Sequence, residues 1–169
     1  MHRSRVELLG ESVPAELPLP TSAIEDGITV GDWVAVDPGR ERIVAVLDRI
    51  GAFKRRAAGV ESKTQLIAAN VDTLFIVTSA NRDFNAARLE RYLAIAREAG
   101  AFPVIVISKA DTVDDVRDYV NEASRLAPGM VVEALDARDP DAVSVLASWC
   151  GEGQTVALVG SSGVGKSTL

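Results

Sequence analysis

The stretch TVALVGSSGVGKSTL (Thr155–Leu169) decides the fold of this chain. An apolar run leads into Gly160, and Gly165, Lys166 and Ser167 then complete the pattern G-x-x-x-x-G-K-[ST]. The alternative is an ordinary glycine-rich turn between a strand and a helix. A buried strand directly before the pattern favours a phosphate-binding loop, because that is the setting in which such loops occur.

Each residue type in this loop suits the binding of phosphate. Glycines let the backbone wrap around an anion so that successive N–H groups point inward. Lys166 supplies a positive charge for the β and γ phosphates, and the Ser167 hydroxyl can ligate Mg²⁺. We therefore predict Lys166 and Ser167 as catalytic residues and Ser167 as the metal ligand. The predicted nucleotide-binding residues of this phosphate loop are Gly160, Ser161, Ser162, Gly163, Val164, Gly165, Lys166, Ser167 and Thr168.

Upstream of the loop, strand and helix patterns alternate, which predicts a parallel sheet covered by helices. The strand segments are nearly all apolar, as expected for strands buried on both faces. They are Thr73–Ser79, Pro103–Ser108, Met130–Leu135 and Gln154–Gly160.

Three helices are predicted between these strands. The first places Leu89, Tyr92, Leu93 and Ala96 on one face and ends at Gly100. The second follows Asp111, with Thr112 and Asp115 at the spacing of a capping box. In the third, Asp139 is the N-cap, Pro140 takes the first helical position, and the helix carries Val143, Leu146 and Trp149.

A second motif, SKAD (Ser108–Asp111), directly follows one of the buried strands. Ligands of open α/β sheets bind at such strand ends. The Asp111 carboxylate can accept hydrogen bonds from the N1–H and the exocyclic amine of guanine, and adenine offers no such pair. The alternative is that Asp111 caps the following helix. The predicted guanine-binding residues are Ser108, Lys109, Ala110 and Asp111.

Composition narrows the classes of function. The chain has 169 residues, a net charge of −6 and one cysteine, Cys150, so it is neither a polybasic nucleic-acid binder nor stabilised by an internal disulfide. No apolar run approaches the ~20 residues that span a bilayer. We expect a soluble cytoplasmic protein. Short strand-like runs before Val60 predict a small antiparallel β unit.

The two motifs resemble the guanine-nucleotide elements of a GTPase, but their order along the chain is inverted, as in a circularly permuted GTPase. Among these, the chain is most similar to the bacterial ribosome small-subunit-dependent GTPase family. The resemblance rests on four stretches: VGDWVAVD (Val30–Asp37), the segment Ala68–Gly100, PVIVISKAD (Pro103–Asp111) and the stretch quoted first.

This resemblance implies an OB-like β barrel over residues 1–65 and an incomplete, circularly permuted α/β P-loop GTPase domain over residues 66–169. It implies GTP or GDP with Mg²⁺ as ligands, and zinc bound in a region beyond Leu169. The partners implied are the 30S ribosomal subunit and its 16S rRNA, in late maturation of that subunit. A cytoplasmic monomer that contacts no membrane is expected.

The sequence departs from the family pattern in three places. Ser108 stands where these proteins carry Asn, and Asp136–Ala137 stands where they have Ser-Ala behind the base. The chain also ends at Leu169, before the switch segments. We therefore expect a fragment in which the phosphate loop is frayed, GTP binds weakly and turnover is inefficient.

The proposed RNA-binding residues are five cations near the end of the small β unit: Arg49, Lys54, Arg55, Arg56 and Lys63. The alternative for this cluster is a solvated strand face. Trp33 is predicted in the barrel core rather than as a platform for base stacking.

Two other classes of function remain open beside the GTPase of ribosome assembly. One is an ATP-using P-loop enzyme whose catalytic domain begins at Thr155. The other is a non-enzymatic rRNA-binding adaptor with a vestigial nucleotide site, for which Ser108 is the best support.

Overall fold

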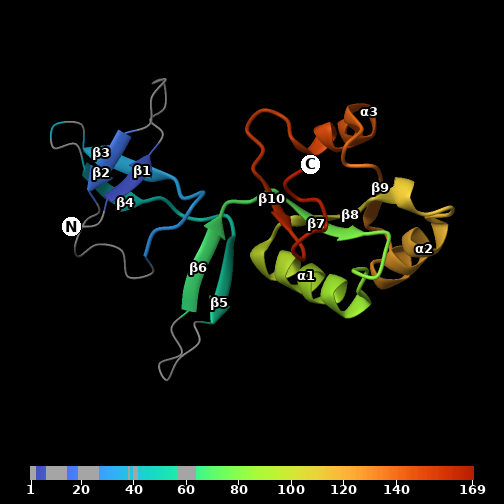
Figure 1. Cartoon of the computed structure of the whole chain (residues 1–169). Coiled ribbons are helices and arrows are strands. Elements are labelled where there is room, and N and C mark those ends of the chain that lie inside the picture. The colour runs from blue at the N-terminus through green and yellow to red at the C-terminus, as the bar shows by residue number, and fades with distance from the viewer. Residues whose placement is uncertain (1–2, 7–14, 19–26, 38, 40–41, 57–63) are drawn as a thin grey trace. The chain divides into compact units, whose positions relative to one another are not determined.

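The chain forms two compact units, Met1–Asn70 and Val71–Leu169 (Figure 1). The computed structural model describes residues 3–6, 15–18, 27–37, 39, 42–56 and 64–169. The boundary predicted between residues 65 and 66 falls inside strand β6 (Thr64–Ala69), which pairs with its neighbour in the first unit.

Antiparallel strand pairs make up the described part of the first unit. They form three two-stranded sheets among the described residues: β1 (Arg3–Val6) with β2 (Ala15–Pro18), β3 (Val34–Asp37) with β4 (Arg42–Val46), and β5 (Ala52–Arg56) with β6. The register shifts between Ala35 and Val36 and again between Phe53 and Lys54. Such bulges bend a strand and increase its twist.

Trp33 does not lie in a core, so this prediction is wrong. Its side chain is 57% exposed, whereas the core of the first unit contains Ile43 and Phe53 at 0% and 7% exposure. Trp33 precedes β3, and its carbonyl accepts a hydrogen bond from the N–H of Leu47 just beyond β4. The ring therefore lies past the end of this strand pair rather than between its buried side chains.

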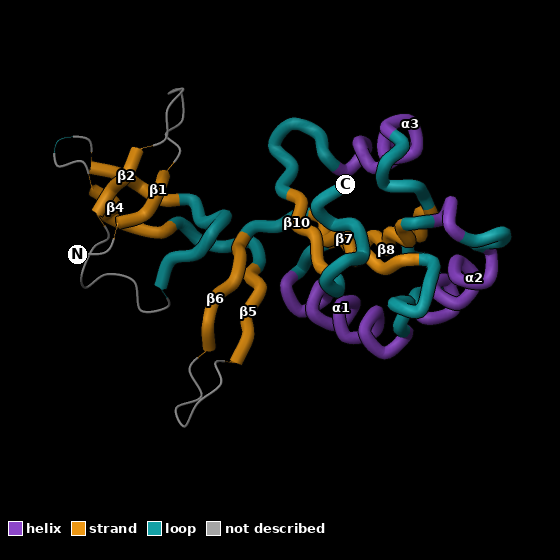
Figure 2. Tube along the Cα trace, in the orientation of Figure 1, coloured by secondary structure: helices purple, strands orange, loops and turns teal. Residues whose placement is uncertain are grey.

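The second unit is a four-stranded parallel sheet in the order β10-β7-β8-β9 (Figure 2). Its strands are β7 (Thr73–Ser79), β8 (Phe102–Ser108), β9 (Val131–Ala134) and β10 (Val156–Val159). The predicted strands are confirmed, with ends that differ by two residues or fewer. Every residue of β7 is buried, as predicted from its unbroken apolar run.

Helices lie on both faces of this sheet (Figure 1). They are α1 (Ala86–Ala99), α2 (Arg117–Leu126) and α3 (Pro140–Val143), with the 3₁₀ turns η1 (Ala110–Thr112) and η2 (Ser144–Trp149). The apolar stripe predicted for α1 is confirmed in that Leu89, Leu93 and Ala96 are buried. On the other face, the Trp149 ring packs edge-on against Phe75 with ring centroids 6.2 Å apart.

The helix ends follow the sequence signals in two cases. The Asn85 side chain accepts a hydrogen bond from the N–H of Arg88, and Gly100 closes α1 in the left-handed conformation at φ 72°. Asp139 caps α3 with Pro140 in the first turn, as predicted. The third helix is shorter than expected, because it continues as the 3₁₀ turn η2 after Val143.

The predicted start of the second helix is wrong. Helix α2 begins at Arg117, and no side chain caps it. The Thr112 hydroxyl instead donates to the carbonyl of Lys109 within η1. The Asp115 carboxylate accepts hydrogen bonds from the backbone and guanidinium of Arg117, which lower the pKa of Asp115 to about 2. An Asx-type turn therefore replaces the capping box.

None of the helices in the described ranges combines the length and the apolar content needed to cross a membrane.

The N-cap of α1 gives a direct test of this fold. We expect Asn85→Ala to lower the free energy of unfolding by about 1 kcal/mol, because N-cap removal leaves a helix N–H without its partner. Urea denaturation followed by circular dichroism measures this change. Asn121→Ala is the matched control, since Asn121 is exposed inside α2, and a shift below about 0.5 kcal/mol is expected there. Equal losses in both variants would contradict the assignment.

Candidate functional site

The site lies where parallel strands of the second unit end. The phosphate loop (Gly160–Thr168) leaves β10, the guanine motif (Ser108–Asp111) leaves β8, and residues 135–138 leave β9. Because the carboxyl ends of parallel strands meet at one edge, these segments gather there. They line a cavity of about 210 Å³, formed by Ser108, Lys109, Asp111, Thr112, Asp136, Ala137, Arg138, Gly165 and Thr168.

Glycine is required at two positions of the phosphate loop, at Gly160 by a close approach to the sheet and at Gly165 by its positive φ. A Cβ at Gly160, where φ is 152°, would lie 2.2 Å from the carbonyl oxygen of Val77. At Gly165, where φ is 93°, it would lie 3.5 Å from the Ser108 hydroxyl oxygen. Larger residues at Gly160 would push the loop away from the sheet.

The expected fraying of this loop is wrong for the structure. The Val164 side chain is 1% exposed and packs with Phe75 and Val77 in the core. Arg88 of α1 donates a hydrogen bond to the Ser161 hydroxyl. At the end of the loop, the N–H groups of Thr168 and Leu169 donate to the carbonyl of Gly165 and close a turn. Core packing and these bonds hold the loop in place.

The Lys166 ammonium group lies over its own loop. Its Nζ donates hydrogen bonds to the carbonyl oxygens of Gly160 at 3.0 Å and Ser161 at 2.6 Å. Phosphate oxygens entering the loop would replace these carbonyls as acceptors. Ser162 and Ser167 are exposed beside it.

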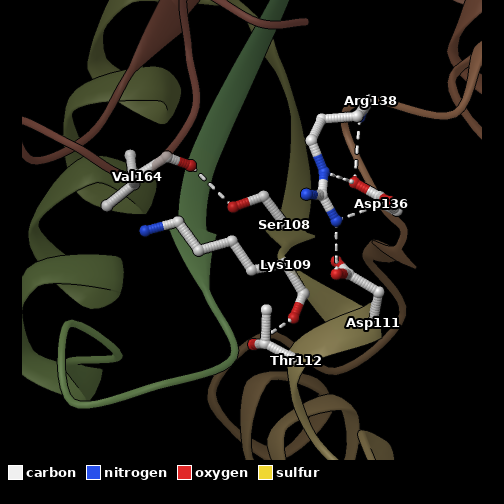
Figure 3. Close-up of polar contacts among 7 residues, drawn as sticks. All are labelled: Ser108, Lys109, Asp111, Thr112, Asp136, Arg138 and Val164. Carbon is white, nitrogen blue, oxygen red and sulfur yellow. Dashed lines mark hydrogen bonds and ion pairs between the residues drawn. The ribbon is translucent and has the colours of Figure 1, made fainter.

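Ser108 connects the two motifs through its buried hydroxyl. The side chain is fully buried, and its oxygen lies 3.0 Å from the carbonyl of Thr78 and 2.6 Å from the carbonyl of Val164. The hydroxyl is the donor, and its single proton is shared between these two carbonyl oxygens. Ser108 therefore ties the end of β8 to the end of β7 and to the phosphate loop, and Figure 3 shows its bond to Val164.

Charged side chains are among those that line the cavity, and Figure 3 shows their contacts. The Arg138 guanidinium donates to the Asp111 carboxylate at 2.6 Å and to both oxygens of Asp136 at 3.1 Å. Hydrogen bonding by Arg138 lowers the pKa of Asp136. Asp111 does not cap α2, because that helix begins at Arg117. The Asp111 side chain is therefore not required to cap a helix.

Sequence reasoning missed two arginines of this site. Arg138 directly follows the Asp136–Ala137 pair that had been compared with the family pattern, and this adjacency was the available signal. Arg88 lies in the first turn of α1, which follows β7. Helices that follow parallel strands begin near the carboxyl edge of the sheet, so their first turns lie beside its ligand site.

The five predicted RNA-binding cations have different surroundings in the structure, and two of their side chains are not described. Arg49 is held by the Asp32 carboxylate, at 2.6 Å and 2.8 Å. Burial raises the pKa of Asp32, but the hydrogen bonds and charge of Arg49, with the N–H of Thr29, outweigh it and lower the value. Lys54 and Arg55 are exposed on β5. The Arg56 side chain and all of Lys63 lie outside the described residues.

Comparison with known proteins gives the family. The family model described as "RsgA GTPase" matches residues 46–169. This chain belongs to the RsgA GTPase family. It is 52% identical, over its whole length, to the small ribosomal subunit biogenesis GTPase RsgA of Mesorhizobium japonicum, of which it covers 49%. It is 50% identical over 99% of its length to RsgA 2 of Vibrio parahaemolyticus, covering 46% of that protein.

This RsgA-family chain thus spans about half the length of the curated relatives it matches. Its fold is similar to that of YjeQ from Thermotoga maritima, with a TM-score of 0.72 and 21% identity over 98% of this chain and 62% of YjeQ. It is also similar to YloQ, described as a circularly permuted GTPase, with a TM-score of 0.64, 23% identity, and coverage of 99% of this chain and 63% of YloQ.

The buried hydroxyl of Ser108 in this RsgA-family chain can be tested by removing it. We expect Ser108→Ala to lower the free energy of unfolding by about 1–3 kcal/mol, because buried carbonyls lose their donor. Ser148→Ala is the control, since the Ser148 hydroxyl is exposed and donates to a carbonyl at 3.3 Å. Denaturation of both variants measures the difference. A loss at Ser108 no larger than that at Ser148 would show that the hydroxyl does not hold the loop.

Proposed function

We propose that the protein binds and hydrolyses GTP as a factor for late maturation of the 30S ribosomal subunit. The observation that carries this proposal is that Asp111 and two residues of the phosphate loop, Gly165 and Thr168, line one cavity. The names of the curated relatives, small ribosomal subunit biogenesis GTPases, support the ribosomal role.

In the proposed complex, the phosphates of GTP or GDP lie in the loop Gly160–Thr168, and the base lies in the cavity beside it. Backbone N–H groups and Lys166 bind the phosphate oxygens. The Asp111 carboxylate accepts hydrogen bonds from guanine, while Lys109 and Ala137 line the same space. Ser108 does not read the base, because its hydroxyl is buried against two carbonyls. Its role is to position the loop.

Magnesium fits this arrangement as a partner of the nucleotide. Mg²⁺ prefers six oxygen ligands and usually takes several from phosphates and water. The exposed hydroxyl of Ser167 supplies one ligand from this chain. Bound Mg²⁺ would supply charge neutralisation at the phosphates, and Lys166 would add a second positive charge there.

The ATP-using enzyme and the nucleotide-independent adaptor remain the competing functions. Both predict that Asp111 makes no distinction between purines. A carboxylate at the cavity favours a base that offers two adjacent donors, and adenine offers no such pair, because its N6 amine lies beside the acceptor N1. The position of Asp111 therefore favours a GTP-binding function over both competing functions.

The choice of nucleotide can be measured at Asp111. We expect Asp111→Asn to weaken GDP binding about 10- to 100-fold and to leave ADP binding unchanged, because hydrogen bonds to a charged acceptor contribute about 1.5–3 kcal/mol. Displacement of a fluorescent GDP analogue measures both affinities in the full-length protein. Asp114→Asn is the control, since Asp114 is exposed and does not line the cavity. Equal affinity of the unaltered protein for GDP and ADP would favour the ATP-using enzyme.

We further propose that the first unit is an OB-like barrel that contacts 16S rRNA through Lys54, Arg55, Arg56 and Lys63. Lys54 and Arg55 support this, because both are exposed cations of β5. Arg49 is left out, since Asp32 already holds its guanidinium. A cytoplasmic monomer is also proposed. Zinc binding is assigned to no described residue, and the described ranges hold no cluster of three or more potential ligands.

Charge reversal tests the RNA contact. We expect Lys54, Arg55 and Arg56→Glu to reduce binding to 30S subunits at least tenfold at low salt, because each lost phosphate contact removes a counterion-release contribution. Sedimentation with purified 30S subunits measures binding. Arg91, Arg97 and Arg125→Glu gives the same change in net charge on exposed helix positions of the second unit. Unaltered binding of the first variant, or equal loss in both, would contradict the proposal.

A further inference from the structure

The Arg138 guanidinium donates a hydrogen bond to Asp111, the carboxylate that binds guanine in the proposed function. Its Nη2 donates to Asp111 Oδ2 at 2.6 Å (Figure 3), and both residues line the cavity. The same group donates to Asp136 through Nε and Nη2, each at 3.1 Å. One arginine thus bridges two carboxylates that come from the ends of two neighbouring strands, β8 and β9.

A guanidinium and the edge of guanine present the same donors to a carboxylate. In guanine, N1–H and the exocyclic amine sit on two nitrogens attached to one carbon, which is the arrangement of a guanidine. Arginine offers its N–H groups in the same planar fork, which matches a carboxylate. The side chain and the base therefore compete for the Asp111 oxygens, and both cannot use them fully at once.

We propose that Arg138 is a specificity-determining residue that binds Asp111 when the cavity is empty and is displaced from it by guanine. This inference rests on the proposed function, because it takes Asp111 as the group that reads the base. Asp136 keeps Arg138 close after displacement, through the hydrogen bonds it already makes. The backbone N–H of Arg138 also donates to Asp136, at 2.9 Å, which fixes the anchor.

The contact between Arg138 and Asp111 lowers the affinity only of ligands that bind Asp111. A guanine nucleotide must break the contact between Arg138 and Asp111, whereas an adenine nucleotide need not. The Arg138 side chain is 70% exposed and that of Asp111 is 33% exposed, so the pair is a weak surface interaction. Removing Arg138 should therefore strengthen GDP binding by about 1.5- to 5-fold.

The experiment compares Arg138→Met with the unaltered full-length protein. GDP and ADP dissociation constants are measured by displacement of a fluorescent GDP analogue, and their ratio cancels the general effect of a lost positive charge on anion binding. We expect the preference for GDP to rise in Arg138→Met. Arg138→Lys keeps the charge but loses the planar fork, so a smaller rise is expected.

Arg117→Met is the matched control for arginine removal. Arg117 makes an exposed ion pair with Asp115 at 2.7 Å, and neither residue lines the cavity. The GDP preference should stay unchanged in this variant. In an Asp111→Ala background, Arg138→Met should also leave the preference unchanged, because its effect acts through Asp111.

Three outcomes overturn the inference. They are an unchanged or lowered GDP preference in Arg138→Met, an equal rise in Arg117→Met, and the same rise in the Asp111→Ala background. Failure of the proposed function looks different, since Asp111→Ala alone would then leave the GDP preference unaltered. A melting curve for each variant confirms that it is folded before binding is compared.

Discussion

Parallel pairing between β10 and β7 is the constraint on which the site depends. The last strand of the chain lies beside the first strand of its unit, in a register that joins Val156 to Thr73 and Val159 to Ile76. On the other side of β7, Ser79 pairs with Ser108 of β8. The phosphate loop and the guanine motif therefore emerge at one edge, although Ser108 and Val164 are 56 positions apart in sequence.

Two cations at this edge, Lys166 and Arg138, are already bound by oxygens of the chain itself. Lys166 donates to two carbonyls of its loop, and Arg138 donates to Asp111 and Asp136. At these two side chains, a nucleotide would thus exchange partners rather than meet an unpaired charge. The affinity for the nucleotide then depends on the difference in free energy between two sets of hydrogen bonds. It is therefore sensitive to side chains such as Arg138, which bonds Asp111 only when the cavity is empty.

The sequence predicted well those features that depend on local patterns. Unbroken apolar runs located β7 and β8, because strands buried on both faces need apolar side chains throughout. It failed where local signals competed, as at Asp115, which bonds Arg117 in a turn instead of capping a helix with Thr112. It could not place Trp33 or Arg138, because the position of each depends on contacts between segments distant in sequence.

The most direct test of the central idea, that both motifs bind one nucleotide, is to follow backbone amide signals by NMR during titration with GDP and with ADP. We expect GDP to shift the amides of Gly163 and Gly165 together with those of Lys109 and Asp111. ADP should shift the loop amides far more than those of the guanine motif. If saturating GDP moves the loop signals and leaves Asp111 and its neighbours in place, the two motifs do not share a ligand.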